Sequence, residues 1–292
     1  MAGAEDFEGQ RRYLGAVAYR MLGSLADAED VLQEAWLRWR DVDHAAIENP
    51  RGYLTTVVTR LCYDHLDSAR VRREAYVGEW LPEPLVDDAP GPHDRAELGE
   101  EVSFAVMALL ERLSPAERAA FVLHDVFGLD FRQIAGALDR SEAAVRQLAS
   151  RARKQVKEDA PRRTVDRAAH RRAVQAFAAA VTGGDLAGLL KVLDPETVWR
   201  ADGGGNVQAG LRPVYGVDKV LRLIKGIVET RLAPGAVPAP VDVNGEPGIA
   251  LYRADGTPLA VLAFCVGEDG LITAIYNVVN PQKLTRVAAL DG

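Results

Sequence analysis

The feature that most constrains the fold is a pair of short amphipathic segments joined by a turn, within residues 131–154. Asp130 can cap the first segment, with a glutamine three residues later as its capping-box partner, and Ser141 can cap the second. In the second segment Val145 and Leu148 lie on one apolar face at helical spacing. The pattern predicts a helix-turn-helix whose second helix directs polar side chains outward.

Charge supports a nucleic-acid partner for this segment but not for the whole chain, whose net charge is −7. Residues 132–163 hold nine Lys or Arg against four Asp or Glu, whereas residues 1–131 are strongly acidic and residues 164–292 are balanced. Positive charge is what neutralises DNA phosphates, and Arg and Gln can pair with guanine and adenine edges in the major groove. We therefore predict a DNA-reading helix; the alternative is a solvated basic helix in an ordinary bundle. The candidate DNA-binding residues are Ser141, Arg146, Gln147, Ser150, Arg151 and Lys154.

The length of 292 residues allows two or three domains, each with its own core. Cys62 and Cys265 are far apart in apolar segments, which favours buried free thiols in a reducing cytoplasm. The N-terminus lacks a signal-peptide pattern, and no apolar run approaches the roughly 18 residues of a membrane span. We expect a cytoplasmic protein with no membrane anchor and no metal or other cofactor.

The chain divides into three parts. Apolar residues recur at helical spacing from Phe7 to about Arg73, interrupted by a loop at residues 41–50, and a second helical unit begins where Ser114 can form a capping box. Between them, residues 80–101 contain four prolines and seven acids against one base, which indicates an extended acidic linker that either occupies a nucleic-acid groove or is only a soluble spacer.

After Pro161 the pattern changes to two helices and then strands. The helices are expected at residues 165–181 and 186–193, the second ending at Asp194-Pro195. Short β-rich runs follow at residues 197–200, 249–253, 259–266 and 271–279, with Asp-Gly turns at 255–256 and 269–270. Helices followed by an antiparallel meander predict an α+β domain.

Several motifs in the first two parts resemble one known family. They are Asp27-Ala-Glu-Asp-Val-Leu-Gln-Glu34, Trp36-Leu-Arg-Trp39, Pro50-Arg-Gly-Tyr-Leu54, Leu61-Cys-Tyr-Asp-His-Leu66 and the helix-turn-helix. In this order they resemble the extracytoplasmic-function group of bacterial RNA polymerase sigma factors, and the resemblance covers residues 1–158. It implies a transcription initiation factor that directs core RNA polymerase to specific promoters.

The resemblance also assigns partners to residues. It implies that the Asp27–Glu34 motif binds the clamp helices of the polymerase β′ subunit, that the β subunit is a further contact, and that the helix-turn-helix reads the promoter minus-thirty-five element. Asp30, Gln33 and Glu34 lie at spacings of three and four, so they share a helical face that can meet a basic coiled coil; without the family this is only a solvated acidic face. The polymerase-binding candidates are Asp27, Asp30, Gln33 and Glu34. The candidates for the minus-ten element are Arg51, Tyr53, Arg60 and Asp64, with Arg70, Arg72 and Arg73 along the DNA backbone.

Three further motifs resemble the sigma-J-like subgroup, whose C-terminal domain is SnoaL-like. They are Trp80-Leu81-Pro82-Glu83-Pro84, Asp202-Gly203-Gly204-Gly205 and Asn280-Pro281-Gln-Lys-Leu284, and by resemblance they connect the C-terminal domain to the sigma core or linker and regulate it. Gln282 and Asn206 depart from the subgroup, which often has an acid and a lysine there. The expected fold is multidomain: two all-α sigma domains, the second with the helix-turn-helix, then an α+β SnoaL-like cone-shaped domain. The expected boundaries are 1–75, 76–103 for the linker, 104–160 and 165–292.

Two other functions compete with this interpretation. A one-component ligand-responsive regulator would share the helix-turn-helix but leave the Asp27–Glu34 motif without a role and would usually need a dimer. Relatives of the SnoaL-like fold include polyketide cyclases, so Asp202 is a possible base. However, the only histidine after the helix-turn-helix, His170, is predicted to lie far from the strands. We therefore expect a protein that has no enzymatic activity and is monomeric when it is not bound to its partners. The C-terminal pocket is either vestigial or the site of an unknown small ligand.

Overall fold

The computed structural model describes residues 2–74, 76–87, 102–159, 165–230 and 235–290. These residues form two compact units. Unit 1 contains residues 2–74, 102 and 109–159, and unit 2 contains residues 76–87, 103–108 and the described residues from 165 onward. Most of the acidic linker, residues 88–101, lies outside the described residues, as do the side chains of Arg70, Arg72 and Arg73. No helix in the described part of the chain has the length and apolar character needed to cross a membrane.

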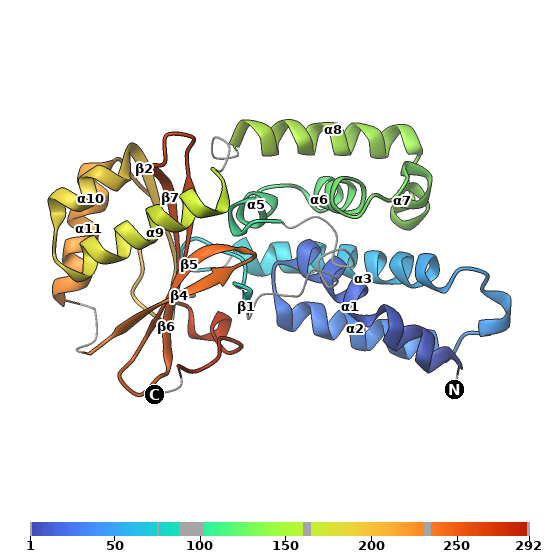
Figure 1. Cartoon of the computed structure of the whole chain (residues 1–292). Coiled ribbons are helices and arrows are strands. Elements are labelled where there is room, and N and C mark those ends of the chain that lie inside the picture. The colour runs from blue at the N-terminus through green and yellow to red at the C-terminus, as the bar shows by residue number, and fades with distance from the viewer. Residues whose placement is uncertain (1, 75, 88–101, 160–164, 231–234, 291–292) are drawn as a thin grey trace. The chain divides into compact units, whose positions relative to one another are not determined.

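Unit 1 is built from helices (Figure 1). Their bounds are α1 Ala2–Leu22, α2 Leu25–Arg40, a 3₁₀ turn His44–Ala46, α3 Pro50–Glu74, α6 Pro115–Phe121, a π-helical turn Val122–Val126, α7 Phe131–Leu138 and α8 Glu142–Asp159. Helix α5 spans Phe104–Leu110, and its first five residues belong to unit 2. The predicted capping box at Ser114 is confirmed, with Pro115 in the first turn and the Glu117 side chain bonded back to the Ser114 N–H.

The core of unit 1 joins the two helical parts of the chain. Helix α1 packs on α2 and α3, while α3 also contacts α6 and α7. Arg118 of α6 is almost fully buried, pairs with Glu111 at 2.8 Å, and donates from Nε to the carbonyl oxygen of Arg20 near the end of α1 at 3.3 Å. A buried guanidinium without such partners would be strongly destabilising, so these contacts specify how α6 meets α1.

Unit 2 is a mixed sheet with helices on one face (Figure 1). Its elements are β1 Val86–Asp87, α9 Arg167–Thr182, α10 Leu186–Val192, β2 Leu193–Asp202, β3 Val214–Tyr215, α11 Val217–Thr230, β4 Val237–Val243, β5 Glu246–Tyr252, β6 Pro258–Val266, β7 Ile272–Val278 and a final 3₁₀ turn Pro281–Lys283. The strand order is β1-β4-β5-β6-β7-β2-β3. Strands β4 to β7 form an antiparallel meander, and the two predicted Asp-Gly turns close two of its hairpins.

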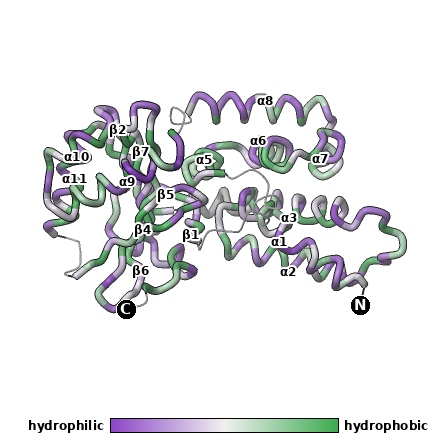
Figure 2. Tube along the Cα trace, viewed as in Figure 1, coloured by the Kyte–Doolittle hydropathy of each residue, from purple (hydrophilic) through white to green (hydrophobic). Residues whose placement is uncertain are grey.

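The sheet has an apolar core on each face. One core joins β2, β5, β6 and β7 to α9 and α11 through Phe177, Trp199, Ile224 and Phe264. The other core contains Leu81 and Phe104, from either side of the acidic linker, together with Leu284 and Val287 from the C-terminal segment. The linker therefore supplies part of the second core rather than acting only as a spacer. Figure 2 shows that hydrophobic residues are concentrated along the central strands.

One sequence expectation for unit 2 was wrong. Strand β2 does not continue an antiparallel meander, because it pairs parallel to β7 after α11 and four other strands have intervened. Helix α10 ends at Val192, one residue before the predicted end, and Asp194 and Pro195 then lie inside β2, where the register with β7 shifts between Leu193 and Val198. Such an irregularity accommodates a proline, which has no N–H for the ladder. Helix α11 and strand β4 were not predicted from the sequence.

Candidate functional site

The helix-turn-helix is α7 followed by α8, and both predicted caps form. The Asp130 carboxylate accepts from the Gln133 N–H at 2.7 Å, and the Gln133 side chain accepts from the Asp130 N–H at 3.2 Å. The Ser141 hydroxyl accepts from the Ala144 N–H at 3.2 Å. Between the helices Asp139 has a φ of 51°, a left-handed conformation that ends α7 and reverses the chain. Short-range hydrogen bonds thus form the turn that the sequence predicts.

Helix α8 buries Val145 and Leu148 and leaves its candidate DNA-binding side chains exposed. Arg146 is held by Glu142 one turn earlier at 2.9 Å, and its guanidinium lies 5.3 Å from the centre of the Phe131 ring. These contacts are solvent-exposed and therefore weak enough to be exchanged for a ligand. The other exposed candidates on this surface are Ser141, Gln147, Ser150, Arg151 and Lys154.

Helix α2 presents most of the predicted polymerase-binding residues to solvent. Asp30, Gln33 and Glu34 are exposed, with Glu34 bonded to Arg38 at 2.6 Å along the same helix. Asp27 differs, because its carboxylate faces His65 of α3 at 3.3 Å. Asp27 thus connects α2 to α3, while the other three residues form an exposed acidic and amide surface.

The candidates for the minus-ten element lie along α3 in different environments. The guanidinium of Arg51 stacks on Tyr13 at 3.9 Å, Tyr53 is partly exposed beside Trp39, and Asp64 is exposed. Arg60 instead donates to two carbonyl oxygens of α7, those of Gly136 at 2.8 Å and Ala137 at 3.2 Å. In this conformation the Arg60 guanidinium is therefore occupied by the helix-turn-helix.

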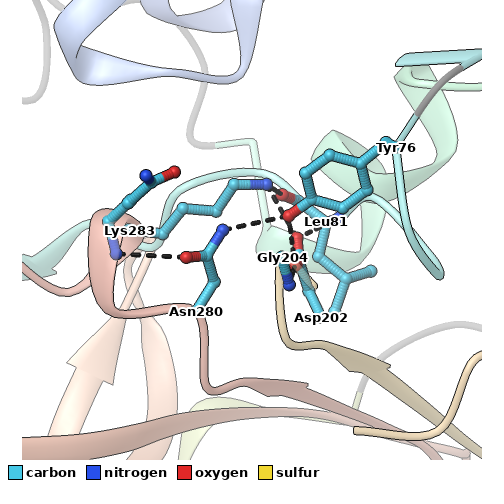
Figure 3. A network of polar contacts seen from close by, with 7 residues as sticks. Tyr76, Leu81, Asp202, Gly204, Asn280 and Lys283 are labelled. Carbon is cyan, nitrogen blue, oxygen red and sulfur yellow. Dashed lines mark hydrogen bonds and ion pairs between the residues drawn. The ribbon is translucent and has the colours of Figure 1, made fainter. Parts of the chain in front are cut away.

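The three motifs specific to the subgroup meet at one buried carboxylate, Asp202 at the end of β2 (Figure 3). Its Oδ1 accepts from the Tyr76 hydroxyl at 2.5 Å and the Gly204 N–H at 3.0 Å. Its Oδ2 accepts from the Leu81 N–H at 2.9 Å and pairs with the Lys283 Nζ at 2.7 Å. All four acceptor positions of this fully buried carboxylate are thereby used, which is the condition for burying the charge. We call these five residues the linker latch.

Aromatic rings and a second ion pair extend the latch. The Lys283 Nζ lies 3.3 Å from the centre of the Trp80 ring and also donates to the Leu81 carbonyl oxygen at 2.5 Å. Arg200, two residues before Asp202 on β2, pairs with Glu79 of the linker. Burial, and then the hydrogen bond to the Asp202 carboxylate, raise the pKa of Tyr76, so its phenol remains the donor.

The glycines after Asp202 allow two other segments to approach. A Cβ on Gly204 would lie 2.4 Å from the amide nitrogen of Asn280, and one on Gly205 would lie 3.2 Å from Val77. Both glycines have positive φ, at 63° and 74°, so a side chain would be disfavoured twice. Asn280 in turn donates to the Tyr76 hydroxyl at 3.0 Å and caps the Pro281–Lys283 turn.

The comparisons with known proteins agree with this arrangement. Residues 7–72 match the family Sigma-70 region 2, and residues 103–156 match Sigma-70, region 4. The chain is 43% identical to the ECF RNA polymerase sigma factor SigJ of Mycobacterium tuberculosis over 96% of this chain and 92% of the relative. The chain belongs to the ECF RNA polymerase sigma factors.

Two further comparisons cover the same length. The probable ECF RNA polymerase sigma factor SigI of M. tuberculosis is 37% identical over 97% of this chain and 94% of the relative. The crystal structure of M. tuberculosis SigJ superposes with a TM-score of 0.78 at 40% identity, covering 97% of this chain and 98% of that one. The predicted sigma-J-like family is confirmed, as is the order of two helical sigma domains followed by an α+β domain. The one-component regulator is not favoured.

Two members of the latch in this sigma factor, Tyr76 and Lys283, were not predicted from the sequence, and one residue, His170, was predicted in the wrong place. Lys283 lies within a quoted motif, and a lysine in an otherwise apolar C-terminal segment was a usable signal; Tyr76 carried none. His170 is not far from the strands: it is buried on α9 and bonds to the backbone of Pro247 in β5. Burial, with the nearby Arg167 charge, lowers the pKa of His170 to about 4, so it is neutral at pH 7. The error arose because the charged residues of α9 occupy only its outer face.

Proposed function

We propose that this protein directs core RNA polymerase in the cytoplasm to a small set of promoters and that its C-terminal domain modulates that activity through the linker. The observation that carries the first part is full-length similarity to ECF sigma factors, at 43% identity over 96% of the chain. The proposed domains are residues 1–75 for polymerase and minus-ten binding, 104–160 for minus-thirty-five binding and 165–292 for regulation, with the linker at 76–103.

The proposed polymerase contact is the exposed surface of α2 formed by Asp30, Gln33 and Glu34. Carboxylates there complement basic residues of the β′ clamp helices, and solvent-exposed charges speed encounter and orient the partner. The contact between the Asp27 carboxylate and the His65 ring at 3.3 Å supports a positioning role for Asp27, since it holds α2 against α3.

The proposed promoter contacts lie on α8 and α3. Arg146 and Gln147 project from the first turns of α8, the part of a recognition helix that enters the major groove. Ser150, Arg151 and Lys154 follow on the same helix toward the phosphates. On α3, Arg51, Tyr53, Arg60 and Asp64 are proposed to bind the minus-ten element, which requires Arg60 to leave the α7 carbonyls.

The proposed regulation acts through the linker latch. Residues 76–87 leave α3 directly, and yet Leu81 is buried in the core of unit 2 and bonded to Asp202. A regulator that retains part of the linker limits how far the flanking sigma domains can separate. This supports a role in controlling the open arrangement that promoter binding needs, by shifting a population between latched and released forms.

The decisive experiment is run-off transcription with purified core polymerase and a promoter from upstream of this protein's own gene. We compare the full chain with Asp30→Ala/Glu34→Ala and with a matched control, Glu5→Ala/Asp6→Ala, which removes two exposed acids from α1. Transcript should fall at least tenfold for the α2 variant and stay near wild type for the control. Equal transcript from all three proteins would refute the α2 contact, and failure of the wild-type chain to bind core polymerase would refute the function.

A further inference from the structure

A cavity of about 210 Å³ lies between the sheet of unit 2 and helices α9 and α11. Its walls include Phe177 and Val181 of α9, Ile224 and Ile227 of α11, and Trp199 and Leu262 of the sheet. It is separate from the latch, because Asp202 and its partners do not line it. Val228, also in its wall, is partly exposed, so solvent reaches the cavity on that side.

The chemistry of the walls restricts what can occupy the cavity. Apart from the Thr182 hydroxyl and the Trp199 indole N–H, the lining side chains among the described residues are hydrocarbon, and none of them is charged. A charged ligand would lose its hydration without gaining an ion partner, which is strongly unfavourable. An apolar cavity of roughly 150 Å³ is sufficient to bind benzene, so this one suits two fused rings.

We propose that this cavity binds an uncharged, mainly apolar small molecule of about two fused rings. This deepens the proposed regulatory role of the C-terminal domain and rests on it for its biological meaning, but the binding itself does not depend on transcription. The walls select ligands by charge and by size, because they provide apolar contacts within a limited volume. The Thr182 hydroxyl and the Trp199 indole N–H can orient the ligand.

Strand β2 connects the cavity to the latch. Side chains alternate along a strand, so Trp199 and Ala201 belong to the core on the helix side, whereas Arg200 and Asp202 bind the linker on the other side. Only three positions separate the cavity wall at Trp199 from the carboxylate that holds Leu81. A ligand that packs against Trp199 restrains β2 in the conformation that forms the latch. Coupling is reciprocal, so the latched state in turn binds the ligand more tightly.

The binding test is equilibrium dialysis of the full chain with naphthalene as the probe and naphthalene-2-sulfonate as its charged counterpart. We expect saturable binding of one naphthalene per chain and at least tenfold weaker binding of the sulfonate. Ala178→Phe, which fills the cavity, should weaken naphthalene binding at least tenfold, while Ala176→Phe on the exposed side of α9 should not. Val228→Trp at the partly exposed edge is a second blocking variant that leaves the core intact.

Circular dichroism confirms that each variant is folded before its binding is compared. Absence of saturable naphthalene binding, equal affinity for the sulfonate, or unchanged binding by both blocking variants would overturn the proposal. Hydrogen exchange tests the connection to the latch. Naphthalene should slow exchange of the Leu81 amide at least threefold, and unchanged exchange at saturating naphthalene would overturn the coupling through β2. Naphthalene binding and hydrogen exchange are both measured on the purified chain, so a failed transcription assay would leave both results unchanged.

Discussion

Replacing Lys283 by methionine tests whether the latch depends on its buried charge. Methionine keeps much of the apolar stem but removes the ammonium, which pairs with the Asp202 carboxylate at 2.7 Å where both side chains are buried. It also removes the donor to the Leu81 carbonyl and the cation over the Trp80 ring. Removing one partner of a buried pair typically costs about 3–5 kcal/mol, because the remaining charge is left uncompensated. We expect Lys283→Met to lower the free energy of opening of unit 2 by that amount.

Native-state hydrogen exchange of peptides from β2 and β7 measures that free energy without requiring the whole chain to unfold in one step. The matched control is Lys225→Met, which loses only an exposed pair with Glu229 at 3.8 Å and should change the value by less than about 0.5 kcal/mol. If the uncompensated carboxylate is the cause, the free energy of opening should be higher for Asp202→Asn/Lys283→Met than for Lys283→Met alone, by about 1 kcal/mol or more. The reasoning would be refuted if Lys283→Met lowered the free energy of opening no more than Lys225→Met does. It would also be refuted if the double variant were less stable than Lys283→Met.

Two further predictions concern other parts of the chain. Arg146→Ala should weaken binding to a matched promoter by about 1–3 kcal/mol and reduce the preference over a promoter altered at the minus-thirty-five element, measured by titration at constant salt; equal weakening on both DNAs would argue against base reading. His170 has a folded-state pKa of about 4 against an ordinary value of 6.5, so the unfolded chain binds more protons between these pH values. The stability from neutral His170 is therefore present above pH 6.5 and is lost as the pH falls toward 4, by as much as about 2–3 kcal/mol. Urea titrations at pH 7 and pH 4.5 should show a smaller pH-dependent loss for His170→Gln, and an identical loss would contradict the assignment.

The latch binds the first residues of the acidic linker to unit 2. Residues 76–87 pack against the sheet and supply Tyr76, Trp80 and Leu81, whereas the composition of the segment left open a linker that occupies a nucleic-acid groove or a soluble spacer. Proline content explains the extended backbone but not its partner. Asp202 determines the partner, because its buried carboxylate needs hydrogen bonds. The Leu81 N–H donates one of the four that this carboxylate accepts.

Parts of the fold that depend on neighbouring residues could be predicted from the sequence. The capping boxes at Ser114 and Asp130, the cap at Ser141, the buried face of α8 and the Asp-Gly hairpins all form as expected. Each depends on residues two to four positions apart, so the chemistry of a short segment is sufficient. Strand β4 was missed because its two prolines and exposed positions conceal the alternating pattern.

The sequence by itself determined the local helices, caps and turns of this sigma factor and, through its ordered motifs, the family. Only the tertiary structure decided that Asp202 meets Leu81 and Lys283, that Arg60 is held by α7, and that β2 runs parallel to β7. The physical reason is distance along the chain. A carboxylate has the same local signal whether it caps a turn, serves as a base or anchors a linker 121 residues away, and only packing decides which partners reach it.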